Sequence, residues 1–383
     1  MTMKNFELLV YIGRFQPFHF GHLAVITQAL AISDRLLILC GSAHQARSVR
    51  NPWTIEERTS MVRQSLDAKA NKHTMIEALP DFVGDDDLWV SYVKDVVSRV
   101  KCDNKNGGAS CKALSDTIPS RNANVKIGLI GHTKDTSSYY LEMFPQWERI
   151  EVKNREGIDA TDIRKNFFSD ESKRYLSQKA QLFLPEPVRT MLFDFRKTID
   201  FQNLCEDKAY FAQYAQAWSM APYPPMLITA DALVVQGSHI LLVRRKNSPG
   251  KGLLALPGGF VNHDESIETA CYRELIEETN LDLTYSAFRA FLKRHRVFDD
   301  PQRSLRGRTI THAFLISLPS KEALPIVEGG DDACAAHWVE LGSIQEPHMF
   351  EDHYHIIQTL TNNAKYSSIE HLINHLDKRA IHP

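Results

Sequence analysis

Apolar runs and helix-like repeats alternate along the first 130 residues of the chain. Buried strands are predicted where apolar residues follow one another almost without interruption, at 7–12, 35–40 and 125–130. Helices are predicted at 22–31 and 54–66, and Thr54 followed by two glutamates is typical of a helix N-terminus. Because strands alternate with helices, we expect βαβ units on a parallel sheet.

The pattern changes between residues 182 and 225. Pro185 and Pro187 interrupt it, residues 188–218 are expected to be helical, and the Pro-rich stretch 221–225 is expected to be a stiff linker. Past the linker, a hairpin is predicted from strands at 226–235 and 240–245, followed by strands at 310–317 and 337–341 and helices at 354–362 and 369–376. We therefore expect a first domain at 1–187, a connector at 188–225 and a second domain at 226–383.

Length and composition fit two ordinary globular domains. The chain has 383 residues, a formal net charge of −2 and no long basic tract, so nucleic acid is not expected as a partner. Six scattered cysteines without a CxxC pair argue against a disulfide framework or a zinc site. The stretch 101–124, rich in Lys, Asn, Ser and Gly, is expected to be an exposed insertion.

No apolar stretch is long enough to span a bilayer, and no secretion signal is recognisable ahead of the first strand. We expect a cytoplasmic protein without a membrane partner. Whether the chain forms a homo-oligomer is left open.

Three glutamates, Glu274, Glu277 and Glu278, stand at i, i+3 and i+4 of a predicted helix. Residues at this spacing share one helix face, so their carboxylates are expected to converge. Without a cation they would repel one another and raise each other's pKa values. Carboxylate oxygens suit Mg²⁺, or Mn²⁺ in its place, and such ions are used on phosphate substrates. The pattern therefore predicts a metal site that handles a diphosphate.

The run 259–281 resembles the Nudix box, a glycine loop followed at fixed spacing by Arg-Glu-Leu-x-Glu-Glu. Gly259 begins it, and Asn280 replaces its last glycine, a mild change because Asn also suits a left-handed helix C-cap. The resemblance implies an α/β/α domain with a mixed sheet, in which the three glutamates bind metal. It also implies that Arg273 orients one of these glutamates and that Glu265 supports the start of the helix.

Two features of this second domain each have two interpretations. The acidic stretch 328–332 either supplies the general base or a further metal ligand, or is a polar turn. Arg303, Arg306 and Arg308 are expected to clamp phosphate, although a solvated loop also fits. ADP-ribose hydrolases often carry a proline at a set distance after the box, and Val297 occupies that position here.

The segment 13–22, Gly-Arg-Phe-Gln-Pro-Phe-His-Phe-Gly-His, lies between the first strand and the first helix. Ligands bind to α/β sheets at the carboxyl ends of such strands. Gly21 permits close backbone approach, and the helix N-terminus beyond it favours anions. His19 and His22 can direct their imidazoles at phosphate oxygens, and Arg14 can add positive charge.

This segment, with Gly13, Arg14 and Phe15 ahead of His-x-Gly-His, resembles the opening of the nicotinamide mononucleotide (NMN) adenylyltransferases, which belong to the HxGH nucleotidyltransferase superfamily. Two further stretches match that family in order, Asn-Pro-Trp-Thr-Ile-Glu-Glu-Arg at 51–58 and Ile-Asp-Ala-Thr-Asp-Ile-Arg at 158–164. Serine is usual where Asp159 stands, so a hydroxyl donor is replaced by an acceptor there.

The resemblance implies roles for individual residues. His19 and His22 would stabilise the charge that develops during adenylyl transfer, while Thr161 and Arg164 would hold the β- and γ-phosphates of ATP. Asn51 would form a hydrogen bond with the nicotinamide group, and Trp53 would stack on its ring. Trp89 is either a second stacking residue or a half-buried core residue.

Together the two halves resemble the bifunctional NMN adenylyltransferase/Nudix hydrolases. A Rossmann-like, doubly wound α/β domain would make NAD and pyrophosphate from NMN and ATP. The second domain would cleave ADP-ribose to AMP and ribose 5-phosphate, a coherent pairing because ADP-ribose remains when nicotinamide leaves NAD. The alternatives are a second domain that senses ADP-ribose or NAD without cleaving it, and a nucleotidyltransferase with another phosphate acceptor.

Overall fold

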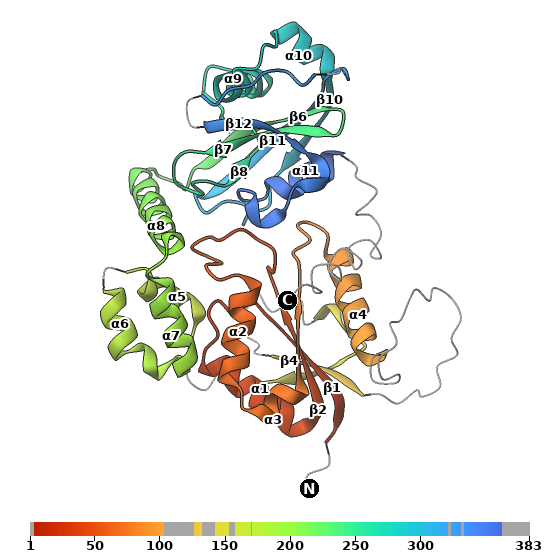
Figure 1. The fold of residues 1–383 in the computed structure, drawn as a ribbon, viewed down its shortest axis with the longest axis vertical. Coiled ribbons are helices and arrows are strands. Elements are labelled where there is room, and N and C mark those ends of the chain that lie inside the picture. The colour runs from red at the N-terminus through yellow and green to blue at the C-terminus, as the bar shows by residue number, and fades with distance from the viewer. Residues whose placement is uncertain are drawn as a thin grey trace, which may run out of the picture. The chain divides into compact units, whose positions relative to one another are not determined.

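The computed structural model of the protein describes residues 4–102, 126–131, 142–152, 158–169, 171–320, 323–330 and 333–361. The chain divides into two compact units, Met1–Phe201 and Gln202–Pro383, each with its own sheet (Figure 1). Nearly all of the predicted insertion 101–124 and the whole of the predicted helix 369–376 lie outside the described residues.

The first unit is built on a five-stranded parallel sheet in the order β3-β2-β1-β4-β5. The two central strands, β1 and β2, are almost continuously apolar and buried, as expected of a parallel sheet covered by helices on both faces. In Figure 1, helices α2 and α4 lie on opposite sides of these strands. The strands are β1 (Phe6–Gly13), β2 (Ser33–Cys40), β3 (Thr74–Ala78), β4 (Ile127–Gly131) and β5 (Glu148–Glu151).

The helices of this unit begin with α1 (Phe20–Ile32) and α2 (Ile55–Ser65). Thr54 caps α2 in a capping box with Glu57, as its sequence predicts. The other helices are α3 (Ala68–His73), α4 (Asp86–Cys102), α5 (Ala160–Phe167), α6 (Ser172–Gln178), η2 (Ala180–Leu182) and α7 (Glu186–Phe195). The predicted βαβ arrangement is confirmed, and the five elements expected before residue 131 shift at their ends by only one or two residues.

The helical stretch predicted at 188–218 is two helices, α7 and α8 (Ile199–Ala217). The break between them includes Thr198, whose hydroxyl accepts a hydrogen bond from the backbone N–H of Phe201 at 3.2 Å. Such a side-chain acceptor begins a new helix, and periodicity alone did not reveal it.

The second unit contains a mixed sheet in the order β10-β11-β6-β7-β12, with β8 paired to β7 and β9 to β6. Strands β6 and β11 are parallel and the other pairs are antiparallel. The predicted hairpin of β6 and β7 is confirmed. The strands are β6 (Met226–Gln236), β7 (His239–Arg245), β8 (Leu254–Ala255), β9 (Gly258–Phe260), β10 (Leu292–Phe298), β11 (Arg308–Ser317) and β12 (Ala333–Glu340).

Apolar side chains on β6 alternate between two cores. Ala232 and Val234 pack with Leu275 of α9 (Ile267–Thr279), and α10 (Tyr285–Phe291) adds to the same core. Leu233 packs on the other face with Ile356 of α11 (His353–Thr361). The domain is therefore an α/β/α sandwich, as expected. Two short turns of 3-10 helix, η3 (Leu341–Ser343) and η4 (Glu346–His348), precede α11.

The start of β12 is the strand boundary that differs most from the prediction, and the strands β8, β9 and β10 were not predicted. The strand expected at 337–341 begins at Ala333, because its pairing with β7 continues through the small residues 333–336, which carry no alternating pattern. Within the described ranges, no helix combines the length and apolar character needed to cross a membrane.

The buried strand β2 should be far more sensitive to truncation than the surface of the same unit. We expect Leu37→Ala to lower the free energy of unfolding by about 2–5 kcal/mol, because Leu37 is fully buried at the centre of the sheet. Leu182→Ala is the matched control, since that leucine is 66% exposed and its loss should be nearly neutral. Urea denaturation of the full chain, followed by circular dichroism, compares the two variants; equal effects would contradict the described core.

Candidate active sites

Two histidines lie at the N-terminus of α1. His19 is the N-cap, and its Nδ1 accepts the backbone N–H of His22 at 3.4 Å, while Nδ1 of His22 accepts the backbone N–H of His19 at 3.2 Å. The rings stack with centroids 3.6 Å apart. Because both Nδ1 atoms are acceptors, each neutral ring carries its proton on Nε2. The pair therefore presents N–H donors at a helix N-terminus, an arrangement suited to an anion.

Gly21 and Gly13 each lie in close contact with an aromatic ring. A Cβ on Gly21 would lie 3.0 Å from the His19 ring, and a Cβ on Gly13 would lie 3.0 Å from the ring of Phe15. Phe15 itself has a positive φ of 53°, which is uncommon for a non-glycine residue and is held by complete burial of its side chain.

Gln16 joins the three stretches that the sequence singled out in this domain. Its side chain donates to the backbone oxygen of Trp53 at 2.8 Å and accepts the Trp53 N–H at 3.1 Å. Its own backbone oxygen accepts a hydrogen bond from Arg164, which also donates to the Thr161 hydroxyl at 3.3 Å. The structure thus brings together segments that are up to 148 positions apart in sequence.

Arg58 holds the carboxyl ends of two strands against α2. Its guanidinium is buried and donates to the backbone oxygens of Arg14 and Gly41, both at 2.7 Å, and of Ser42 at 3.1 Å. It also donates to the backbone oxygen of Thr54 at 3.2 Å. The sequence reasoning gave Arg58 no role, because nothing in a local pattern shows that a charged residue will be buried.

Three arginines, Arg14, Arg50 and Arg164, act on one another at this site, with Asp159 as a nearby acid. Burial lowers the pKa of Arg164 to about 10, and the neighbouring Arg14 adds to the effect. Burial and Arg50 lower the pKa of Arg14 in the same way. Such shifts show that cations disfavour one another here, so a bound anion would relieve the conflict.

Asp159, the departure from the family pattern, has a structural role. It is the N-cap of α5, and its Oδ1 accepts the backbone N–H of Thr161 at 2.6 Å. An aspartate caps a helix as well as serine does, so the replacement preserves the orientation of the Thr161–Arg164 turn.

The two tryptophans differ. Trp53 is 2% exposed, and its ring packs against Phe167 and Phe195 at centroid distances of 5.5 and 6.0 Å. The expected stacking of Trp53 on nicotinamide does not fit this packing, because no face of the ring is open. Trp89 is only partly buried, beside Phe144 at 5.8 Å, and it remains the stacking candidate.

Asn51 is placed for hydrogen bonding. Its side chain is buried and donates to Gln45 Oε1 at 2.7 Å. Its Oδ1 has no partner among the described residues, and neither has the indole nitrogen of Trp53. Buried polar atoms without partners are rare and indicate an unseen water or ligand.

In the second domain, Arg273 organises the carboxylate helix α9. Its five N–H groups form a bidentate pair with Glu265 at 2.6 and 3.0 Å and contact Glu274 at 2.8 Å, Glu277 at 2.9 Å and the backbone oxygen of Phe260 at 3.1 Å. The hydrogen bonds from Arg273 lower the pKa of Glu265 to about 2. Arg273 therefore orients two of the three expected metal ligands, where the sequence predicted one.

Glu278 faces the glycine loop. Its Oε2 accepts the backbone N–H of Gly258 at 3.0 Å, and burial raises its pKa to about 8. Burial also raises the pKa of Glu274. A Cβ on Gly259 would lie 2.5 Å from Glu274 Oε1, so a larger residue here would displace this carboxylate.

The donor set suits a divalent ion. Among the described residues, no three His, Cys, Asp or Glu side chains are gathered closely enough to be a metal site as they stand. Glu278 is nevertheless buried and Glu274 half-buried, burial opposes the ionisation of both, and their hard oxygens match Mg²⁺ or Mn²⁺. A cation would favour the charged form of both.

The acidic stretch 328–332 is only partly described. The backbone N–H of Glu328 donates to Thr279 O at 3.0 Å, and that of Gly330 donates to Glu278 O at 3.2 Å, so the stretch contacts the end of α9. Asp331 and Asp332 lie outside the described residues, and their role as base or ligand stays a prediction. Asn280 has a left-handed φ of 48°, which confirms the predicted C-cap.

A polar cavity of about 40 Å³ lies beside Glu278. Arg303 and Arg306 line it as expected, but both are engaged: Arg303 with Asp352 at 2.8 and 2.9 Å, and Arg306 with Glu351 at 3.3 Å. Arg308 does not line it and pairs with Asp299. The other lining residues are Thr229, Asp231, Val243, Arg245, Ala255, Leu256, Gly258, Gly259, Phe350, Glu351 and His353.

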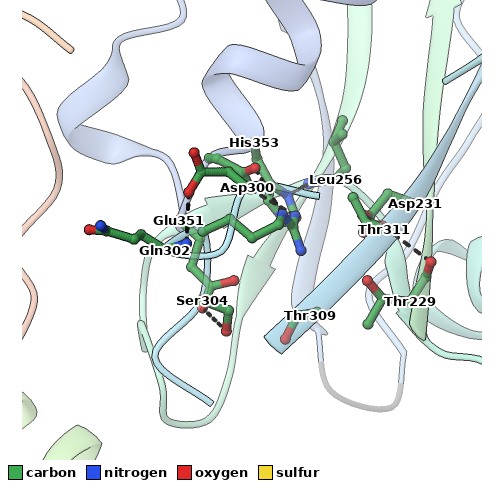
Figure 2. A network of polar contacts seen from close by, with 12 residues as sticks. Thr229, Asp231, Leu256, Asp300, Gln302, Ser304, Thr309, Thr311, Glu351 and His353 are labelled. Atoms are coloured by element: carbon green, nitrogen blue, oxygen red, sulfur yellow. Dashed lines mark hydrogen bonds and ion pairs between the residues drawn. The ribbon is translucent and has the colours of Figure 1, made fainter. Parts of the chain in front are cut away.

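Several of these residues were missed by sequence reasoning. Figure 2 shows Asp231 directed at Thr311, and Glu351 near Ser304, whose hydroxyl donates to it at 2.7 Å. Glu351 has a φ of 44°, a backbone conformation that a non-glycine residue adopts at a cost. For Glu351 and His353, the signal in the sequence was the run Phe-Glu-Asp-His at 350–353, which places three ionisable residues at the start of α11.

Comparison with known proteins agrees with both sites. The cytidylyltransferase-like family matches residues 10–166, and the NUDIX domain family matches residues 226–360. The chain is 37% identical over 167 residues to a nicotinamide/nicotinic acid mononucleotide adenylyltransferase of Acinetobacter baylyi, covering 43% of this chain and 78% of that protein. It is 34% identical over 131 residues to an ADP-ribose pyrophosphatase of Methanocaldococcus jannaschii, covering 34% of this chain and 70% of that one.

Among solved structures, a bifunctional NMN adenylyltransferase/ADP ribose pyrophosphatase of Francisella tularensis, in complex with AMP and a manganese ion, is similar over both domains. The TM-score is 0.79, the identity is 35%, and the match covers 93% of this chain and 99% of that one. The two family matches, the order of the motifs and this whole-chain similarity agree, and the chain belongs to the family of bifunctional NMN adenylyltransferase/ADP-ribose pyrophosphatase proteins.

Proposed function

We propose that the first domain transfers the adenylyl group of ATP to NMN, giving NAD and pyrophosphate. The observation that carries this proposal is the stacked pair of His19 and His22, whose Nδ1 atoms are both occupied and whose Nε2–H groups are thus donors. The NMN phosphate attacks the α-phosphorus, and the bond to pyrophosphate breaks. No covalent intermediate is needed, because positioning and charge stabilisation supply the catalysis.

The two histidines would donate to the phosphoryl oxygens on which negative charge grows. Arg14 and Arg164 would bind the β- and γ-phosphates, since Arg164 is buried and Arg14, which is exposed, lies close enough to lower the pKa of Arg164. The turn that Asp159 caps keeps Thr161 beside Arg164. Trp89 would stack on the nicotinamide ring and Asn51 Oδ1 would accept a hydrogen bond from its carboxamide.

For the second domain, we propose that a divalent ion, Mg²⁺ with Mn²⁺ as a substitute, is held by Glu274, Glu277 and Glu278. Bound there, the ion supplies Lewis-acid stabilisation of the pyrophosphate and activation of the attacking water. The substrate would be ADP-ribose, cleaved by water at its pyrophosphate into AMP and ribose 5-phosphate. Arg273 would keep the carboxylates oriented, and Arg303 and Arg306 would shape the adjoining cavity.

The three glutamates favour a domain that hydrolyses ADP-ribose over a domain that only senses it. A sensor needs no catalytic acids, yet all three glutamates are present and Glu274 and Glu277 are held by one arginine. Hydrolysis is therefore the better explanation.

We expect His22→Ala to reduce NAD formation from NMN and ATP by about a hundredfold, because loss of one preorganised donor to a developing anion costs that much. ADP-ribose cleavage should remain unchanged. His22→Asn should be similarly impaired, although it can still accept the His19 N–H. The partly buried His73, whose ring contacts the Asp34 backbone oxygen, provides the control variant His73→Ala. Pyrophosphate release measures the reaction; loss of both activities would show that the two sites depend on each other.

Glu278→Gln is expected to impair ADP-ribose cleavage and to leave NAD synthesis intact. AMP release from ADP-ribose with Mg²⁺ should fall by about a hundredfold or more, since a neutral amide is a far poorer ligand, whereas NAD synthesis should not change. Glu268→Gln on the same helix is the control, because Glu268 pairs with Arg289 and does not line the cavity. A wild-type protein that binds ADP-ribose without releasing AMP would favour the sensor.

Substitution of Trp89 should affect the binding of NMN, whereas substitution of Trp53 should affect the stability of the fold. Trp89→Leu should raise the KM for NMN about three- to tenfold through loss of ring stacking, with little change in unfolding. Trp53→Leu should instead lower the free energy of unfolding by about 2 kcal/mol, because its ring fills a buried aromatic cluster. Steady-state kinetics and urea denaturation of both variants test this; a larger KM effect in Trp53→Leu would restore Trp53 as the stacking residue.

A further inference from the structure

Asp207 is a buried carboxylate on helix α8, which precedes the region 226–360 that the NUDIX domain family matches. It is 7% exposed, and its two oxygens accept the backbone N–H of Gly250 at 3.1 and 3.3 Å. Gly250 lies in the loop 246–253, which joins β7 to β8. The side chain therefore links two segments of the second compact unit that are 43 positions apart in sequence.

The same loop holds Arg245, the last residue of β7. Arg245 Nε donates to the backbone oxygen of Pro249, the neighbour of Gly250, at 2.8 Å. The backbone N–H of Gly252 donates to the backbone oxygen of Arg245 at 2.9 Å. The loop thus fixes both the backbone and the guanidinium of Arg245.

The ring of Phe350 contacts both the loop and this guanidinium. Arg245 Cζ lies 4.0 Å from the ring centroid, within the range of a cation–π interaction. Gly250 has a positive φ of 73°, and a Cβ on it would lie 2.4 Å from the ring. Because Gly250 packs this closely, a shift of the loop would also move the ring on which Arg245 stacks.

Arg245 lines the cavity beside Glu278. Its charge acts there: burial raises the pKa of Asp231, and Arg245 is one of the cations that oppose this shift. In the proposed hydrolysis the substrate brings a pyrophosphate to the same carboxylate helix. A fixed positive charge at this place would stabilise the negative charge that develops on the phosphoryl oxygens.

We propose that Asp207 is a positioning residue of the second active site, which holds Gly250 and its loop so that the guanidinium of Arg245 is directed at the pyrophosphate of the substrate. Helix α8 is then a functional part of the hydrolase, although it lies before the region that the NUDIX domain family matches. This inference rests on the proposed hydrolysis of ADP-ribose.

Substitutions at Asp207 and Arg245 of the full-length protein test this role. Asp207→Asn keeps an oxygen acceptor for the Gly250 N–H, whereas Asp207→Ala removes it. Arg245→Met removes the charge and keeps much of the length of the side chain. Glu206→Ala is the matched control, because Glu206 is exposed on the same helix. AMP release from ADP-ribose with Mg²⁺ gives kcat/KM, and thermal unfolding reports whether each variant is folded.

We expect Asp207→Ala to lower kcat/KM for ADP-ribose about three- to tenfold, the range of one lost hydrogen bond, and Asp207→Asn to stay within about twofold of the wild type. Arg245→Met should lower it about ten- to a hundredfold, the range for a hydrogen bond to a charged group. In the Arg245→Met background, Asp207→Ala should change kcat/KM by less than about twofold, because Asp207 acts through Arg245.

Three results would overturn the proposal: wild-type activity in Asp207→Ala, an equal loss in Asp207→Asn and Asp207→Ala, or the same loss from Asp207→Ala with and without Arg245. The last result is the one expected of a contact that only stabilises the domain. Asp207→Ser, whose hydroxyl is one atom shorter than the carboxylate, replaces Asp207→Ala where that variant does not fold. A wild-type protein that releases no AMP from ADP-ribose would instead contradict the proposed function itself.

Discussion

In each domain, a single guanidinium gathers the chain segments that form the candidate site. A guanidinium has five donors in a planar fork, and when it is buried these donors must find acceptors or the fold loses several kcal/mol. Arg58 meets this constraint with four backbone oxygens at the ends of β1 and β2 and the start of α2. Arg273, which is only partly buried, donates to three glutamates and one backbone oxygen. The positions of the phosphate-handling groups follow from these two arginines.

The two sites carry opposite electrostatic conflicts. In the first domain, burial and the nearby Arg14 lower the pKa of Arg164, and in the second, burial raises the pKa values of Glu274 and Glu278. A phosphate group would resolve the first conflict and a divalent cation the second. Both conflicts are typical of functional sites, because a fold optimised only for stability would pair or expose such charges. In the proposed reactions, the first domain binds phosphate groups and the second binds a divalent cation.

Much of the fold was predictable because local patterns determined it. Strands β1 and β2 contain the apolar runs 8–12 and 36–40, and Thr54 and Asn280 carry cap signals that act over one helical turn. The motifs of both sites were predictable for the same reason: His19 with His22, and Glu274 with Glu278, are neighbours in sequence. The predictions that failed or were incomplete concern long-range packing. Trp53 was expected to stack on a ligand and is buried against Phe167 and Phe195, which lie more than a hundred residues away.

The sequence by itself determined the two domain types, the order of the motifs and the charges at each site, since periodicity and fixed spacing are properties of the chain. Only the tertiary structure decided that Arg58 is buried, that Gln16 ties Trp53 to Arg164, and that the cavity beside Glu278 contains Asp231, Glu351 and His353. The physical reason is that burial and hydrogen-bond partners are set by segments distant in sequence, which meet only when the sheet and its helices have packed. No local pattern carries that information.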